Sequence, residues 1–121
     1  MATATRSPGA VAATVTPEEL AAVGAALADP TRVRMLRLMR ANEEVACAAL
    51  EATFSLTKST ISYHVRVLRH AGLIRVRKTG KFYHYRLMRD EIEQRFPGLL
   101  TLLAATALPE IAGAGGVADC E

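Results

Sequence analysis

Basic side chains are concentrated in one stretch of this sequence. Between Lys58 and Arg89 the chain has nine Lys and Arg residues and no Asp or Glu, while the other residues supply six basic and twelve acidic side chains. The net charge of +3 therefore divides into +9 in this stretch and −6 elsewhere. Phosphates are neutralised locally and not by the average charge of a molecule, so this segregation predicts a surface that binds a polyanion such as DNA. The nine residues are Lys58, Arg66, Arg69, Arg75, Arg77, Lys78, Lys81, Arg86 and Arg89.

The first half of this stretch has the period of an amphipathic helix, expected over residues 58–71 and ended by Gly72. Ile61, Val65 and Leu68 form its inward stripe, and His64, beside that stripe, is expected to pack and to hydrogen-bond. An ordinary solvated helix would mix charges of both signs, which this one does not. The outward side chains suit base edges and phosphates in a major groove, and the candidates for DNA contact are Lys58, Ser59, Thr60, Ser62, Tyr63 and Arg66.

The second half alternates as two strands, over residues 73–78 and 81–87, with Thr79 and Gly80 in the turn. Tyr83, Tyr85 and Leu87 are expected to face inward. Arg77, Lys78 and Lys81 would contact the DNA backbone or the minor groove, which adds affinity with little sequence information.

Several helices must position this stretch. Thr16, Pro17 and Glu19 predict a capped helix over residues 17–27, and Asp29 begins another over residues 30–41. A short helix over residues 45–54 and a turn at residues 55–57 then precede the basic helix, which is the layout of a helix-turn-helix. Followed by the hairpin, it predicts a mainly α fold with a small β-hairpin, a winged helix-turn-helix. The arginines of the second helix are expected to line its solvent side, at Arg32, Arg34, Arg37 and Arg40.

The remaining segments complete one domain. Asp90 is expected to cap a further helix, and a leucine-rich helix is expected from Leu99 to about Leu108. We predict a flexible tail over residues 1–15, the DNA-binding and dimerisation domain over residues 16–108, and a second flexible tail over residues 109–121. No apolar run has the length of a membrane span, and the spacing of Cys47 and Cys120 favours a reducing cytoplasm over a disulfide framework.

The segments LADPTRVRMLRLM and LEATFSLTKSTISYHVRVLRHAGLIRVRKTGKFYHYRL resemble the ArsR/SmtB family of bacterial winged-helix repressors. The resemblance covers about residues 20–87. It implies a homodimer whose interface is formed by the first and last helices of each protomer. Each protomer would place its recognition helix in one half of an inverted-repeat operator. The apolar character of the end helix agrees with that implication, although its leucines could instead cover the core of a monomer. The expected interface residues are Leu20, Val23, Leu99, Leu102 and Leu103.

The inducer sites of the family match this chain poorly. Its thiolate site uses two cysteines where this chain has Ala46 and Ala48, with Cys47 between them. Its other common site needs histidines along the last helix, where this chain has only carboxylates, at Asp90, Glu91 and Glu93. No cofactor is therefore predicted, and a metal or metalloid ion remains a weaker hypothesis, through a thiol sensor made of Cys47 and Cys120.

We therefore predict a cytoplasmic, dimeric regulator, a repressor that binds double-stranded DNA and is released by an unidentified signal. The alternatives are a constitutive repressor, a thiol-based metalloid or redox sensor, and a winged-helix module that binds an acidic protein. An enzyme is not expected, because no nucleophile–base pair or phosphate loop is visible.

Overall fold

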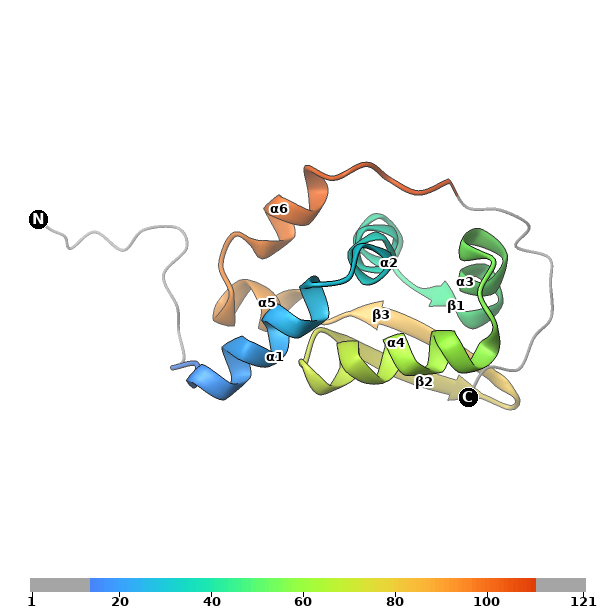
Figure 1. The fold of residues 1–121 in the computed structure, drawn as a ribbon, viewed down its shortest axis with the longest axis horizontal. Helices are drawn as coiled ribbons and strands as arrows, with labels where there is room; N and C mark the ends of the chain where they lie inside the picture. Colours follow the sequence, from blue (N-terminus) through green and yellow to red (C-terminus); the bar gives the residue numbers. More distant parts are fainter. Residues whose placement is uncertain (1–13, 111–121) are drawn as a thin grey trace, which may run out of the picture.

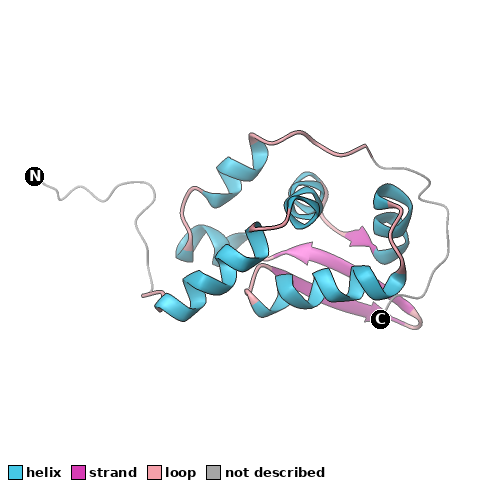
Figure 2. Ribbon diagram, viewed as in Figure 1, coloured by secondary structure: helices cyan, strands magenta, loops and turns pink. Residues whose placement is uncertain are grey.

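The computed structural model describes residues 14–110, which form six helices around a small antiparallel sheet (Figures 1 and 2). Within these residues, no helix is both long and apolar enough to span a membrane. The elements are α1 (Pro17–Leu27), α2 (Pro30–Ala41), β1 (Val45–Ala46), α3 (Cys47–Phe54), α4 (Lys58–His70), β2 (Ile74–Thr79), β3 (Phe82–Leu87), α5 (Arg89–Arg95) and α6 (Leu99–Ala104). The mainly helical winged helix-turn-helix predicted from the sequence is confirmed.

The sheet has the strand order β1-β3-β2, with every pair antiparallel. Ile74 lies opposite Leu87, and Val76 opposite Tyr85, so the inward residues of the hairpin form one apolar face. The hairpin turns at Gly80, whose φ of 60° is in the left-handed region. Helices α1, α5 and α6 gather at one end of the molecule, while the hairpin turn and α3 lie at the other end (Figure 1).

Local capping explains why the first two helices begin where the sequence predicts. The Thr16 hydroxyl accepts a hydrogen bond from the Glu19 amide, and the Glu19 carboxylate accepts one from the Thr16 amide. Asp29 accepts from the Thr31 amide at the start of α2. In the turn before α4, Ser55 adopts a φ of 54°, so a residue with a side chain takes the left-handed position that glycine usually fills.

The hairpin strands and the end of α4 differ from the prediction by one residue, so that Thr79 belongs to β2 and not to the turn, and three other boundaries differ by more. The expected helix over residues 45–54 begins only at Cys47, because Val45 and Ala46 pair with β3 as a strand. Asp90 does not cap α5, whose N-cap residue is Met88, without a side-chain hydrogen bond. The helix expected to reach Leu108 ends at Ala104.

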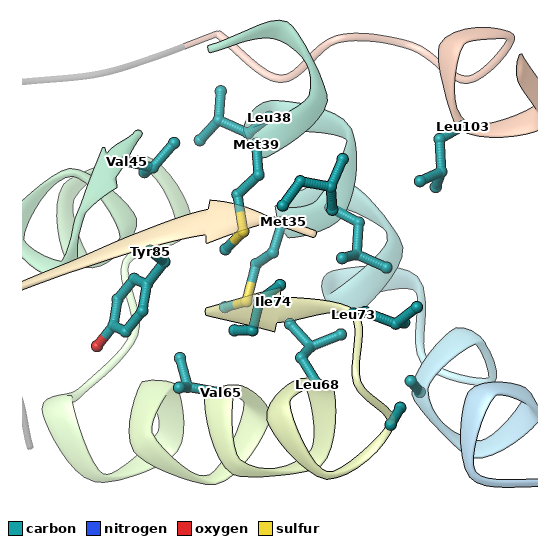
Figure 3. Packing of buried hydrophobic residues seen from close by; sticks show 14 of the residues in the cluster. Met35, Leu38, Met39, Val45, Val65, Leu68, Leu73, Ile74, Tyr85 and Leu103 are labelled. Carbon is teal, nitrogen blue, oxygen red and sulfur yellow. The ribbon is translucent and has the colours of Figure 1, made fainter. Parts of the chain in front are cut away.

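The hydrophobic core lies between α2, α4 and the sheet (Figure 3). Met35, Leu36, Leu38 and Met39 of α2 are fully buried, so this helix is the central one.

The expectation that the α2 arginines line its solvent side is wrong for Arg32, and Arg37 and Arg40 are only partly exposed. Arg32 is only 8% exposed. Arg37 and Arg40 donate hydrogen bonds to the carbonyls of Thr106 and Leu100, which attach the C-terminal segment to α2. Only Arg34 is classed as exposed. A helix surrounded by other segments has little solvent side, and guanidinium groups can satisfy carbonyls that helix ends leave unpaired.

Candidate nucleic-acid interface

The outer face of α4 presents the polar side chains that the sequence predicts as DNA contacts. Lys58, Ser59, Tyr63 and Arg66 are exposed. Tyr63 is a large aromatic residue that remains 53% exposed. Thr60 and Ser62 are partly buried on the flanks, and the opposite face of α4 is buried through Ile61, His64, Val65 and Leu68.

Hydroxyl groups cluster at the N-terminus of α4. Thr57 is the N-cap residue, and its hydroxyl accepts a hydrogen bond from the Thr60 amide at 3.2 Å and donates one to the Thr60 hydroxyl at 3.0 Å. The Ser59 hydroxyl oxygen lies 3.3 Å from the Thr57 hydroxyl oxygen. The predicted contact set leaves out Thr57, although a threonine directly before a helix is a recognisable N-cap signal. The helix end therefore offers a hydroxyl-rich, electropositive surface for a phosphate.

The hairpin, which we call the wing (Ile74–Thr79 and Phe82–Leu87), exposes Lys78, and Lys81 is exposed in its turn. The Lys78 ammonium lies 5.5 Å from the centroid of the Tyr83 ring, within the range of a cation–π contact. These two lysines are at the hairpin end, free to meet a backbone phosphate or a minor groove.

Arg77 of the wing is held by an acidic residue from outside the basic stretch. Its Nε and Nη2 atoms donate to the two carboxylate oxygens of Glu44 at 2.9 and 2.8 Å. This bidentate pair lowers the pKa of Glu44 and raises the pKa of Arg77, in each case mainly through the hydrogen bonds. Separation of charge along the sequence is therefore not complete separation in space, and Arg77 is partly neutralised.

A second residue of the basic stretch, Arg89, is only partly exposed. Arg89 donates from Nη2 to the carbonyls of Met39, Arg40 and Asn42 at 2.9–3.1 Å. These carbonyls lie at the C-terminal end of α2, where backbone acceptors lack helical partners and a cation is favoured. Arg89 thus joins α5 to α2, and its charge does not contribute to the DNA-facing surface as the sequence argument assumed.

A buried contact fixes α4 relative to α1 and α2. The Arg32 guanidinium donates to the carbonyls of Ala26 and Ala25 at 3.1 and 2.8 Å, and its Nη1 atom lies 3.1 Å from Nδ1 of His64 on α4. Since arginine can only donate, His64 must accept at Nδ1 and is therefore the neutral tautomer protonated at Nε2. Burial is the main cause of a lowered pKa for His64, and Arg32 lowers it further against an opposing effect of Asp29. His64 is thus a packing and hydrogen-bonding residue, as predicted.

The predicted dimer residues lie at the end of the molecule formed by α1 and α6. Leu20, Val23, Leu99 and Leu102 border one shallow apolar depression with neighbouring residues. Val23, Leu99 and Leu103 are already buried against their own chain, whereas Leu20 and Leu102 remain 58% and 64% exposed. The exposed apolar surface at this end is therefore smaller than the sequence suggests and is centred on Leu20 and Leu102.

The predicted sensor residues are only partly visible. Cys47 is buried with 1% exposure, and it is not a free thiol, which contradicts the expectation of reduced cysteines. Cys120 lies outside the described residues. Across residues 14–110, no group of three or more His, Cys, Asp or Glu side chains is arranged to hold a metal ion. Asp90, Glu91 and Glu93 are exposed on α5.

Comparisons with known proteins place this geometry in a family. Residues 27–77 match a family model described as a helix-turn-helix domain. The arsenical resistance operon repressor of Staphylococcus xylosus is 32% identical over 76 residues, which cover 63% of this chain and 72% of that protein. A transcriptional repressor SmtB homologue of Synechocystis is 29% identical over 62% of this chain and 56% of that protein.

A solved structure of an ArsR family transcriptional regulator has the same fold, with a TM-score of 0.58, 24% identity and coverage of 68% of this chain and 84% of that one. These relatives are DNA-binding regulators and not enzymes. The chain belongs to the ArsR/SmtB family of winged-helix transcriptional regulators.

Proposed function

We propose that this regulator is a cytoplasmic homodimeric repressor that binds an inverted-repeat operator and leaves it when a signal arrives. The observation that carries the proposal is the division of the surface. One face presents the polar side of α4 and the wing lysines, and a separate end presents exposed leucines. A protein that reads two half-sites needs both surfaces, because two-fold symmetry of the dimer matches the two-fold symmetry of the DNA.

Within the DNA face, α4 and the wing have different roles. Arg66 lies on the exposed side of α4, where a guanidinium can donate two hydrogen bonds to a guanine edge. Lys81 lies in the wing turn, where an ammonium acts as a point charge on phosphate. We infer that α4 supplies sequence discrimination and that the wing supplies general affinity.

The test is a fluorescence-anisotropy titration of the full chain on its own upstream DNA and on random DNA, at several salt concentrations. Arg66→Ala should weaken specific binding about tenfold or more and leave random DNA less affected. Lys81→Ala should weaken both DNAs about equally and reduce the salt slope by about one. Equal losses on both DNAs for both variants would contradict the division of roles. Absence of salt-dependent DNA binding would favour the alternative of a winged-helix module for an acidic protein.

Dimerisation has its own test. Leu102→Glu places a charge in the exposed apolar patch and should yield monomers in light scattering. Thr101→Glu is the matched control, because Thr101 is exposed on the same helix outside the depression. A Leu102→Glu protein that stays dimeric would reject an interface through α6.

The signal is the least constrained part of the proposal. A thiol or metalloid mechanism is favoured by the relative from Staphylococcus xylosus, which is named as an arsenical resistance repressor, and by the presence of Cys47 at the start of α3. Because Cys47 is not a free thiol, a change between oxidising and reducing buffer, or arsenite added to the reduced protein, should then release DNA from the wild-type protein and not from Cys47→Ser. If no such treatment releases DNA, a constitutive repressor or an organic inducer is the better proposal.

A further inference from the structure

A hollow lies between α4 and the wing, at the edge of the core and beside the candidate DNA contacts of α4. Its volume is about 130 Å³, close to that of an engineered apolar cavity that accepts benzene. It is open to solvent on one side, and its lining joins three elements that are separate in the sequence. The lining residues are Ser62, Val65, Arg66 and Arg69 of α4, Val76 of β2, and Tyr83 and Tyr85 of β3.

One residue of the lining, Tyr85, carries a hydroxyl without a hydrogen-bond partner. Tyr85 is 1% exposed, and its hydroxyl oxygen is buried without a hydrogen-bond partner. Figure 3 shows the ring reaching from β3 toward α4, with its oxygen on the side of Val65. A buried hydroxyl left unpaired costs about 1–3 kcal/mol, and native proteins leave few such groups, so each one calls for an explanation. Burial raises the pKa of Tyr85 to about 12, which keeps the hydroxyl protonated and able to donate at neutral pH.

The other polar groups of the lining are also donors. Arg66 and Arg69 supply guanidinium groups, and Ser62 and Tyr83 supply hydroxyls, while no carboxylate lines the hollow. The apolar part comes from Val65, Val76 and the tyrosine rings. Such a lining matches a ligand that has an acceptor-rich, negatively charged end and a compact apolar body, since arginine pairs with a carboxylate through two parallel hydrogen bonds.

We propose that this hollow binds a small organic carboxylate, with its charge between Arg66 and Arg69, its apolar body against Val65 and Val76, and the Tyr85 hydroxyl as a donor. Arg66 also belongs to the DNA face of α4. A bound carboxylate would therefore take Arg66 away from DNA and compete with operator binding. This competition rests on the proposed repressor function, whereas the binding of the ligand does not.

Ligand binding is tested on the full chain without DNA. The chain is titrated with benzoate and followed by two-dimensional ¹H–¹⁵N NMR, in parallel with benzyl alcohol, which lacks the charge, and acetate, which lacks the ring. Benzoate should give saturable shifts at amides of α4 and β3 and should bind at least tenfold more tightly than either comparison compound. Tyr85→Phe should weaken benzoate about tenfold through the loss of one charge-assisted hydrogen bond. Tyr63→Phe, on the exposed side of α4, should not.

Two results would overturn the site. One is the absence of saturable benzoate shifts, which would mean that the hollow holds only water. The other is equal binding of benzoate and inorganic phosphate, which would mean that the hollow is a binding site for a DNA phosphate. An unchanged benzoate affinity in a folded Tyr85→Phe variant would likewise remove the assigned role of the hydroxyl.

Competition is then measured by anisotropy on upstream DNA. With DNA bound in the absence of ligand, benzoate at ten times its Kd should weaken DNA binding about tenfold if the two exclude each other. Unchanged DNA affinity at saturating benzoate would overturn the competition and leave the ligand site standing. Failure to bind DNA at all would refute the proposed function together with the competition, while the NMR titration decides the site independently.

Discussion

Replacement of Arg32 by methionine should destabilise the protein more than any other change of a charged side chain on α2. Arg32 is 8% exposed and donates to two carbonyls at the C-terminal end of α1 and to Nδ1 of His64 on α4. Methionine keeps much of the side-chain volume and removes every donor. The Ala26 carbonyl and the imidazole nitrogen then lose this partner where water has little access, so their desolvation penalty is no longer offset, while the exposed Ala25 carbonyl still accepts from the Ala28 amide.

The size of the effect follows from those groups. Breaking a buried, charge-assisted network by removal of one partner costs about 3–5 kcal/mol, and the methionine recovers part of this because no charge needs to be buried. We expect a net loss of about 3 kcal/mol, out of a total stability of roughly 5–15 kcal/mol for a domain of this size.

Urea denaturation followed by circular dichroism measures the loss as a shift of the midpoint at unchanged slope. Arg34→Met is the matched control, because Arg34 is exposed on the same helix and should change stability by no more than about 0.5 kcal/mol. A loss below about 1 kcal/mol for Arg32→Met would refute the argument that this side chain joins α1, α2 and α4.

Three further predictions concern single groups. Glu44→Gln should release Arg77, tighten binding to all DNA and steepen the salt dependence by about one, measured by anisotropy; Glu43→Gln, whose oxygen is 3.9 Å from its arginine partner, should do less. The pKa of His64 is lower in the folded protein than in the unfolded chain, so on acidification the unfolded chain takes up the proton at a higher pH. The free energy of unfolding should therefore fall as the pH drops through about 6.5. Urea titrations at pH 7.5 and 5.5 measure this dependence, and His64→Gln should flatten it. Tyr85→Phe should leave thermal stability unchanged or raise it by up to about 1 kcal/mol, because the hydroxyl that it removes has no partner; a clear loss in calorimetry would reveal a missing hydrogen bond.

The parts of the fold that the sequence predicts well are those fixed by local signals. The starts of α1 and α2 follow from side chains that bond to amides within three residues, at Thr16 and Asp29. The wing follows from alternation over six residues in each strand. Such signals act within one turn or one strand, so they can be read without knowing what packs nearby.

Strand β1 shows where local signals end. Val45 and Ala46 are too short to display alternation, and their strand conformation exists because they pair with Tyr85 and His84, about forty residues away. For the C-terminal helix, the local signals predict more regular structure than the chain forms. Its leucines favour a helix to Leu108, yet the backbone leaves the helix after Ala104, and the Thr106 carbonyl accepts a hydrogen bond from Arg37. In both places a distant contact overrides the local preference.

The candidate site divides in the same way. The exposed side of α4 follows from helical periodicity, so the positions of Tyr63 and Arg66 were predictable. The partner of Arg77 was not, because Glu44 precedes it by 33 residues and reaches it only through the pairing of β1 with β3. Arg32 was misplaced because arginine is usually exposed, and its burial depends on carbonyls that only the finished packing of α1 brings near.

These contacts change what the basic stretch can do. Nine basic residues in the sequence would suggest nine phosphate contacts in each protomer, but Arg89 is turned toward α2, Arg77 is paired with Glu44, and Arg86 has a carboxylate oxygen of Glu43 at 3.9 Å. Six of the nine remain, at α4, at the start of β2 and at the wing end. Since each neutralised phosphate contributes about 0.9 to the slope of log Kobs against log salt, these six residues account for a slope of about −5 for each protomer on duplex DNA. On the function proposed above, the acidic residues beside the wing limit general affinity for DNA, and the outer face of α4, with its hydroxyls and Arg66, discriminates between sequences.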